Sequence, residues 1–177
     1  MFFYLKLLFH IFLISALTVL QYSFIETLPF WAGNANILIV ALIFVISLKG
    51  LNYALFWGGV AGMLLDFYSF LPFGVFIVLF ISLSVFIYLL SDRVFTNRSL
   101  YSFWALTFFA TIFCRFLFEF LRYFSKSFVS QTELLLLHND FWISLGEAIA
   151  VNLILMLVLF YIFNFVSNRF RPVFIRG

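Results

Sequence analysis

The chain has 177 residues, of which 66% are hydrophobic, 24% aromatic and only 10% charged. Soluble globular domains carry roughly 25% charged residues, so this composition excludes a soluble fold. It also excludes an intrinsically disordered chain, because such chains contain too few apolar residues to collapse. The mean hydropathy of +1.20 indicates that lipid surrounds most of the surface. We therefore expect an all-α integral membrane protein with a single polytopic membrane domain, 1–177.

The first apolar segment allows two interpretations. Lys6 followed by an uncharged stretch, 7–25, superficially fits a secretory signal peptide. The stretch is long for such a signal, and no Ala-x-Ala cleavage site precedes Glu26. A retained first membrane span is the favoured interpretation.

Charged and turn-forming residues divide the chain into six candidate spanning helices. A helix needs about 20 mostly apolar residues to cross a bilayer, and six such segments fit into this length. The predicted helices are 6–25, 30–48, 53–65, 73–90, 99–124 and 141–166. The third is short, at ~20 Å, and it predicts a compact hairpin with the fourth.

The basic residues indicate the orientation of this six-transmembrane-helix bundle. Positive charge near span ends resists translocation, so Lys and Arg are enriched in cytoplasmic loops. With the N- and C-termini in the cytoplasm, most Lys and Arg residues lie inside, namely Lys6, Lys49, Arg93, Arg98, Arg169, Arg171 and Arg176. Only Arg115, Arg122 and Lys126 then lie toward the outside.

No sequence pattern supports catalysis, a cofactor or a metal ion. A Gly-rich phosphate loop, HExxH and GxSxG are all absent from the sequence. Cys114 is the single cysteine, and His10 and His138 fall near opposite membrane faces, so no metal site is expected. The small net charge of +3 comes without the clustered basic face that nucleic-acid binding requires.

The fifth span carries polar residues at helical spacing. They lie three or four positions apart, on one helical face: Thr107, Thr111, Arg115, Glu119 and Arg122. A charge at the depth of Arg115 costs a few kcal/mol and should face protein or water beside a partner. We expect Arg115 to contact Glu119, Glu147 of the sixth span, or both. This charge cluster either fixes helix packing or forms a partner or ligand site.

The third span carries the second pattern. Gly58 and Gly62 form a GxxxG pair, which lets another helix approach closely. Asp66 follows at the end of this span, and a short loop leads to Gly74.

This pattern in a small six-span protein resembles the rod shape-determining protein MreD family, with Gly58, Gly62, Asp66 and Gly74 matching its G…G…D…G pattern. The resemblance implies a non-enzymatic scaffold in the bacterial cell membrane that helps maintain rod shape. Its implied partners are the bitopic stalk protein MreC, the MreB filament and the peptidoglycan synthases. The glycine pair and the polar face of the fifth span are candidate contact surfaces for these partners.

A second family has a similar architecture. Substrate-binding S components of energy-coupling-factor vitamin transporters are also small six-helix membrane proteins. Such a protein would bind a small molecule from outside, where Arg115, Glu119, Glu147 and Asp66 are expected. Against this alternative, the sequence lacks a small-residue helical motif for docking the energising subunit, and its outer loops are short.

Overall fold

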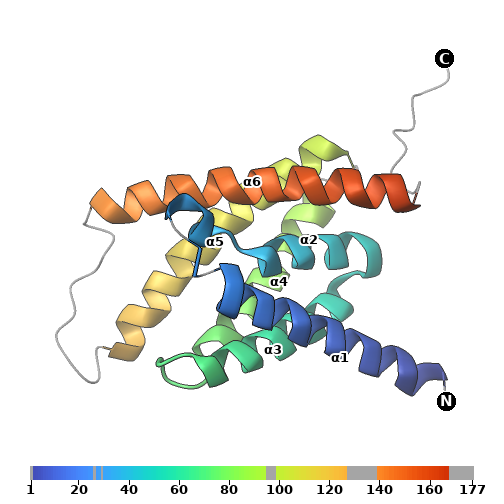
Figure 1. Ribbon diagram of the computed structural model, residues 1–177, viewed down its shortest axis with the longest axis horizontal. Helices are drawn as coiled ribbons and strands as arrows, with labels where there is room; N and C mark the ends of the chain where they lie inside the picture. The colour runs from blue at the N-terminus through green and yellow to red at the C-terminus, as the bar shows by residue number, and fades with distance from the viewer. Residues whose placement is uncertain (1, 26, 29, 95–98, 127–138, 168–177) are drawn as a thin grey trace.

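The computed structural model describes residues 2–25, 27–28, 30–94, 99–126 and 139–167 (Figure 1). In these residues all regular structure is helical, which confirms the all-α prediction. The elements in chain order are α1 (Phe2–Leu20), the π-helical turn η1 (Gln21–Ile25), the 3-10 turn η2 (Phe30–Asn34), α2 (Ile37–Lys49), α3 (Leu51–Tyr68), α4 (Val75–Arg93), α5 (Leu100–Lys126) and α6 (Asn139–Ser167).

Five helical segments in the described part are long and apolar enough to cross a membrane. They are Leu8–Ile25, Ala32–Lys49, Val75–Arg93, Leu100–Phe124 and Asn139–Phe165. The first includes η1 and the second includes part of η2, so two of the five segments are not continuous α-helices. The chain has the character of a multi-pass membrane protein.

The third helix is longer than predicted. It has 18 residues, which corresponds to ~27 Å, and it continues past Asp66 to Tyr68. Asp66 does not end the helix because its carboxylate accepts hydrogen bonds from α4 and does not compete for the α3 backbone. The Ser69 N–H donates to the carbonyl oxygen of Leu65 and closes the last turn.

The core forms around α2. This helix contacts α3, α4, α5 and α6, and its residues Val40 and Ile43 are fully buried. In contrast, α1 packs mainly on α3 at one side of the bundle (Figure 1). Its Phe12 is 71% exposed, which is expected of a ring that faces lipid. Between α4 and α5, the rings of Phe86 and Phe113 stack with centroids 4.1 Å apart.

Contacts between α1 and α3 fix their relative direction. The ring of His10 lies 6.1 Å from that of Trp57, between centroids, in the first half of each helix. At the other end the rings of Tyr22 and Tyr68 stack at 5.4 Å, and the Tyr22 hydroxyl donates to the Tyr68 carbonyl oxygen at 3.1 Å. Helices α1 and α3 therefore run parallel, and α2, which joins them in the sequence, runs in the opposite direction (Figure 1).

Candidate functional site

Two glycines let α3 and α4 approach closely. A Cβ built on Gly62 would lie 2.6 Å from the carbonyl oxygen of Phe76, and one on Gly58 would lie 2.9 Å from that of Phe80. Both distances are shorter than real Cβ contacts, so no side chain fits at either position. The predicted close approach is confirmed. The surface that was a candidate for partner contact is instead occupied by α4.

Asp66 holds the start of α4. Its side chain is buried, and Oδ1 accepts from the Phe76 N–H at 2.9 Å. Oδ2 accepts from the N–H groups of Gly74 at 3.0 Å and Ile77 at 3.3 Å. The first N–H groups of a helix have no partner within the helix and carry partial positive charge, so a carboxylate is well suited to this position.

Gly74 makes this arrangement possible. It is the N-cap of α4 with φ 105°, a left-handed conformation that residues with a side chain rarely adopt. Gly58, Gly62, Asp66 and Gly74 thus belong to one structure, the α3–α4 hairpin. Each of them acts in packing α4 against α3.

A second polar cluster lies where η2, α5 and α6 meet. Arg115 Nη2 donates to Asn34 Oδ1 at 2.9 Å, and Asn34 Nδ2 donates to Glu147 Oε2, also at 2.9 Å. The expected direct contact between Arg115 and Glu147 is therefore wrong, because η2 places Asn34 between them. The expected contact with Glu119 is also wrong, since Glu119 forms an ion pair with Arg122 at 2.9 Å.

The polar face of α5 points into the bundle. Thr107, Thr111 and Glu119 are buried, which confirms the prediction that these residues share one face of the helix. The two threonine hydroxyls donate to carbonyl oxygens one turn earlier in the helix. From Thr107 to Glu119 this face is thus an interior surface, whereas the Arg122 side chain at its end is 26% exposed.

Asn152 of α6 connects α5 to the break between η2 and α2. Its side chain is 1% exposed. Oδ1 accepts from the Asn36 N–H at 2.7 Å, and Nδ2 donates to Thr111 Oγ1 at 3.1 Å. Because lipid offers no hydrogen bonds, a helix break at membrane depth requires such side chains.

Gln21 of η1 supports the same break from the other side. Its Nε2 donates to the Ala35 carbonyl oxygen at 3.0 Å, and its Oε1 accepts from the Ile37 N–H at 2.9 Å. Gln21 is the first residue of the π-helical turn, and its side chain reaches the start of α2. Asn36 completes the support, since its Oδ1 caps α2 by accepting from the Ile39 N–H at 3.2 Å.

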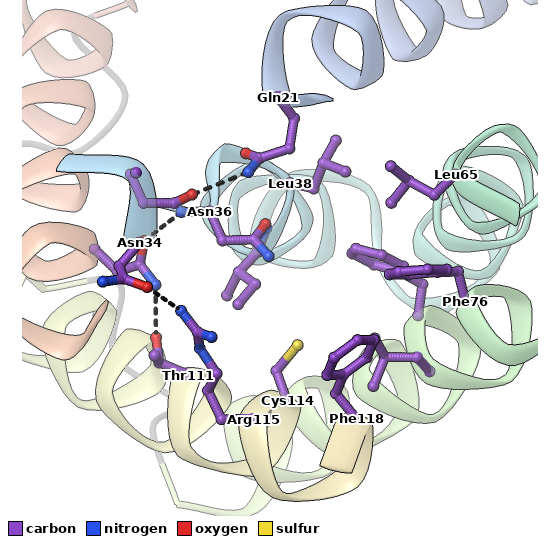
Figure 2. A pocket seen from close by; sticks show the side chains of 16 residues that line it. Gln21, Asn34, Asn36, Leu38, Leu65, Phe76, Thr111, Cys114, Arg115 and Phe118 are labelled. Atoms are coloured by element: carbon purple, nitrogen blue, oxygen red, sulfur yellow. Dashed lines mark hydrogen bonds between the residues drawn. The ribbon is translucent and has the colours of Figure 1, made fainter. Parts of the chain in front are cut away.

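These carboxamides and residues of α3, α4 and α5 line a partly open cavity of about 290 Å³ (Figure 2). Polar side chains gather on one side of it and apolar side chains on the other. The polar lining consists of Gln21, Asn34, Asn36, Thr111, Arg115 and Asn152; the apolar lining includes Leu38, Leu65, Phe76 and Phe118. Glu119, Glu147 and Asp66 do not line the cavity, so of the predicted outer charges only Arg115 reaches it.

Gln21, Asn34 and Asn36 are uncharged, and they are not among the site residues predicted from the sequence. The sequence could have indicated them, because a carboxamide side chain in an apolar span costs free energy unless it has a hydrogen-bond partner. The helix break that brings them together has no comparable local signature.

Replacing Asn152 with leucine is expected to destabilise the protein by about 2–3 kcal/mol, because the part-buried Asn36 N–H loses its acceptor and the buried Thr111 hydroxyl loses its donor. Unfolding in mixed micelles, monitored by circular dichroism, would measure this loss. Asn139→Leu at the exposed start of α6 is the matched control and should change stability by less than about 0.5 kcal/mol. Equal stability of the two variants would contradict the role given to Asn152.

The described residues thus contain a closely packed α3–α4 hairpin and a cavity with a polar and an apolar side. Comparisons with known proteins found no matching family model, no matching curated protein and no matching solved structure. The functional argument therefore depends on the geometry of these two features.

Proposed function

We propose that the chain is a non-enzymatic membrane scaffold of the MreD type, located in the bacterial cell membrane as part of the cell-elongation complex. It would link an MreC-like stalk protein and MreB filaments to peptidoglycan synthesis and so help maintain rod shape. One observation carries the proposal: the four residues of the resemblance, Gly58, Gly62, Asp66 and Gly74, act together in one hairpin. Isolated glycines in apolar sequence would be weak support, whereas four interdependent positions are stronger.

The proposal includes six membrane spans with both termini in the cytoplasm. Helix α3 would be the sixth span, since ~27 Å nearly matches a hydrocarbon core of ~30 Å. The parallel course of α1 and α3 supports alternating crossings. So does Figure 1, in which the start of α1 and the end of α6 lie on the right, and the end of α5 and the start of α6 lie on the left.

Reporter fusions test this topology. Green fluorescent protein fused after Gly177 is expected to fluoresce, and alkaline phosphatase at the same position is expected to be inactive, because six spans return the chain to the cytoplasm. Phosphatase fused after Lys126 should be active, since it follows an odd number of spans. The reverse pattern would contradict this topology, since it follows either if α3 does not cross the membrane or if the six-span bundle is inverted.

Partner contacts in this proposal fall on lipid-facing surfaces. The glycine pair and the polar face of α5 are both used inside the bundle, so neither can bind the span of a stalk protein. The described helices leave large exposed apolar side chains on their outer surfaces, as at Phe12 and Phe24 of the first crossing segment. A single-span partner would pack against such a surface within the bilayer.

The second candidate function is an S component of an energy-coupling-factor transporter. The cavity with Arg115 favours it, because such a protein must bind a small molecule. The two functions differ in the proteins that assemble with the chain. Affinity purification from native membranes in mild detergent, followed by mass spectrometry, separates them.

The scaffold predicts recovery of a bitopic stalk protein in stoichiometric amount, with or without wall synthases. Gly59→Leu should retain this partner, because a Cβ there meets nothing within 4 Å, whereas Gly62→Leu should lose it with the hairpin. Paired ATPases and a coupling membrane subunit in place of the stalk protein would reject the scaffold and establish the transporter component.

A further inference from the structure

The hydrogen bonds around the cavity separate supporting side chains from side chains with free donors. Gln21, Asn34 and Asn152 each donate and accept through their carboxamides. The Thr111 hydroxyl donates to the Thr107 carbonyl oxygen and accepts from Asn152. These groups stabilise the helix break and are engaged with one another.

Arg115 and Asn36 differ from the supporting groups. Arg115 has five N–H donors, and among the described residues its one hydrogen-bond acceptor is Asn34 Oδ1. Asn36 uses its side-chain oxygen for the α2 cap, while its Nδ2 donors have no acceptor in the described part of the chain. Figure 2 shows both side chains directed into the cavity. The free polar groups are thus donors, one of them cationic, and their complement is an anionic acceptor.

The cavity wall opposite Arg115 is apolar and would favour an apolar part of a ligand. Leu65 of α3, Phe76 of α4 and Phe118 of α5 line it, and the rings of Phe76 and Phe118 lie 5.5 Å apart between centroids. A ligand that filled both sides would have a polar end at Arg115 and an apolar body against these rings. The cavity volume of about 290 Å³ lies at the lower end for ligand sites, which run from about 300 to 1,000 Å³, so the ligand is small.

We infer that this cavity binds a small amphipathic carboxylic acid. Its carboxylate would accept from Arg115 and Asn36, and its aromatic or alkyl body would contact Leu65, Phe76 and Phe118. An ionisable side chain within a membrane span is a functional-site candidate in its own right. The inference does not depend on the scaffold role, because it concerns a binding site inside the bundle.

Two sources can supply this chemistry: a water-soluble acid or a fatty acid from the membrane. Phenylacetate and decanoate represent them as probes, and phenylacetamide is the neutral control of nearly the same shape. Binding would be measured by saturation-transfer NMR on the full-length protein in phosphatidylcholine nanodiscs. We expect saturable binding of at least one acid at millimolar concentrations and about tenfold weaker binding of phenylacetamide than of phenylacetate if the latter binds. The acid that binds identifies the source.

Two variants test the assigned donors. Arg115→Gln removes the charge, and Asn36→Asp keeps a side-chain oxygen for the α2 cap while it replaces the free donor with a carboxylate. Each should weaken acid binding about tenfold or more. Arg122→Gln on the same helix, outside the cavity lining, should leave binding unchanged. The melting temperature of each variant separates loss of binding from loss of fold.

Three results would overturn the inference. The first is no binding of either acid to the wild-type protein at millimolar concentrations. The second is acid binding that both variants retain undiminished. The third is that decanoate does not bind and phenylacetate binds no more tightly than phenylacetamide. None of these results bears on the scaffold, which is tested by the proteins that co-purify.

Discussion

Gly62→Leu is expected to destabilise the protein by about 3 kcal/mol or more, because a side chain at this position must displace the backbone of α4. A Cβ would lie 2.6 Å from the Phe76 carbonyl oxygen and 2.7 Å from the Ile77 Cα. Neither atom is the flexible end of a side chain, so α3 and α4 would have to separate. Unfolding in mixed micelles and the yield of monodisperse protein would measure the effect.

Gly59→Leu provides the matched control on the same helix. A Cβ there meets no heavy atom within 4 Å, so the added side chain should extend into free space. We expect a change of less than about 0.5 kcal/mol. If Gly62→Leu were as stable as Gly59→Leu, the close packing of α3 on α4 would be refuted.

Asp66→Leu is expected to cost about 3 kcal/mol or more, since three N–H groups at the start of α4 lose their acceptor. Asp66→Asn should cost less, about 1–2 kcal/mol, because one amide oxygen can still accept. The order of stability measured by unfolding should therefore be wild type, Asn variant, Leu variant.

Asp92→Asn tests whether charge alone matters. Asp92 is exposed in the last turns of α4, and its removal should have little effect on stability. A loss as large as that of Asp66→Leu would contradict the capping role of Asp66.

The helices could be predicted largely from composition, because long uncharged stretches have few alternatives in lipid. The α3–α4 contact could also be predicted, since Gly58, Gly62 and Asp66 are spaced by four residues and share a helix face. The predicted end of the third span at residue 65 is wrong, because Asp66 does not terminate α3, which continues to Tyr68. The partners of Asp66 lie eight to eleven residues further along the chain.

The partners of Arg115 could not be derived in the same way. Sequence spacing correctly placed Arg115 on the interior face of α5, but it could not show that η2 would bring Asn34 to that face, 81 residues away. Such a contact depends on where the second crossing segment breaks. The sequence predicts one helix over 30–48, whereas the structure has η2 up to Asn34 and begins α2 at Ile37.

The bond between Asn36 and Asn152 also affects the order of membrane insertion. The two residues are 116 positions apart, so the second crossing segment enters the bilayer well before α6 has been synthesised. At about 5–20 residues per second, this delay is on the order of 10 s. During that interval the exposed break at the start of α2 needs water, headgroups or an insertion chaperone as a temporary partner. Once α6 has inserted, Asn152 replaces this partner as the acceptor for the Asn36 N–H.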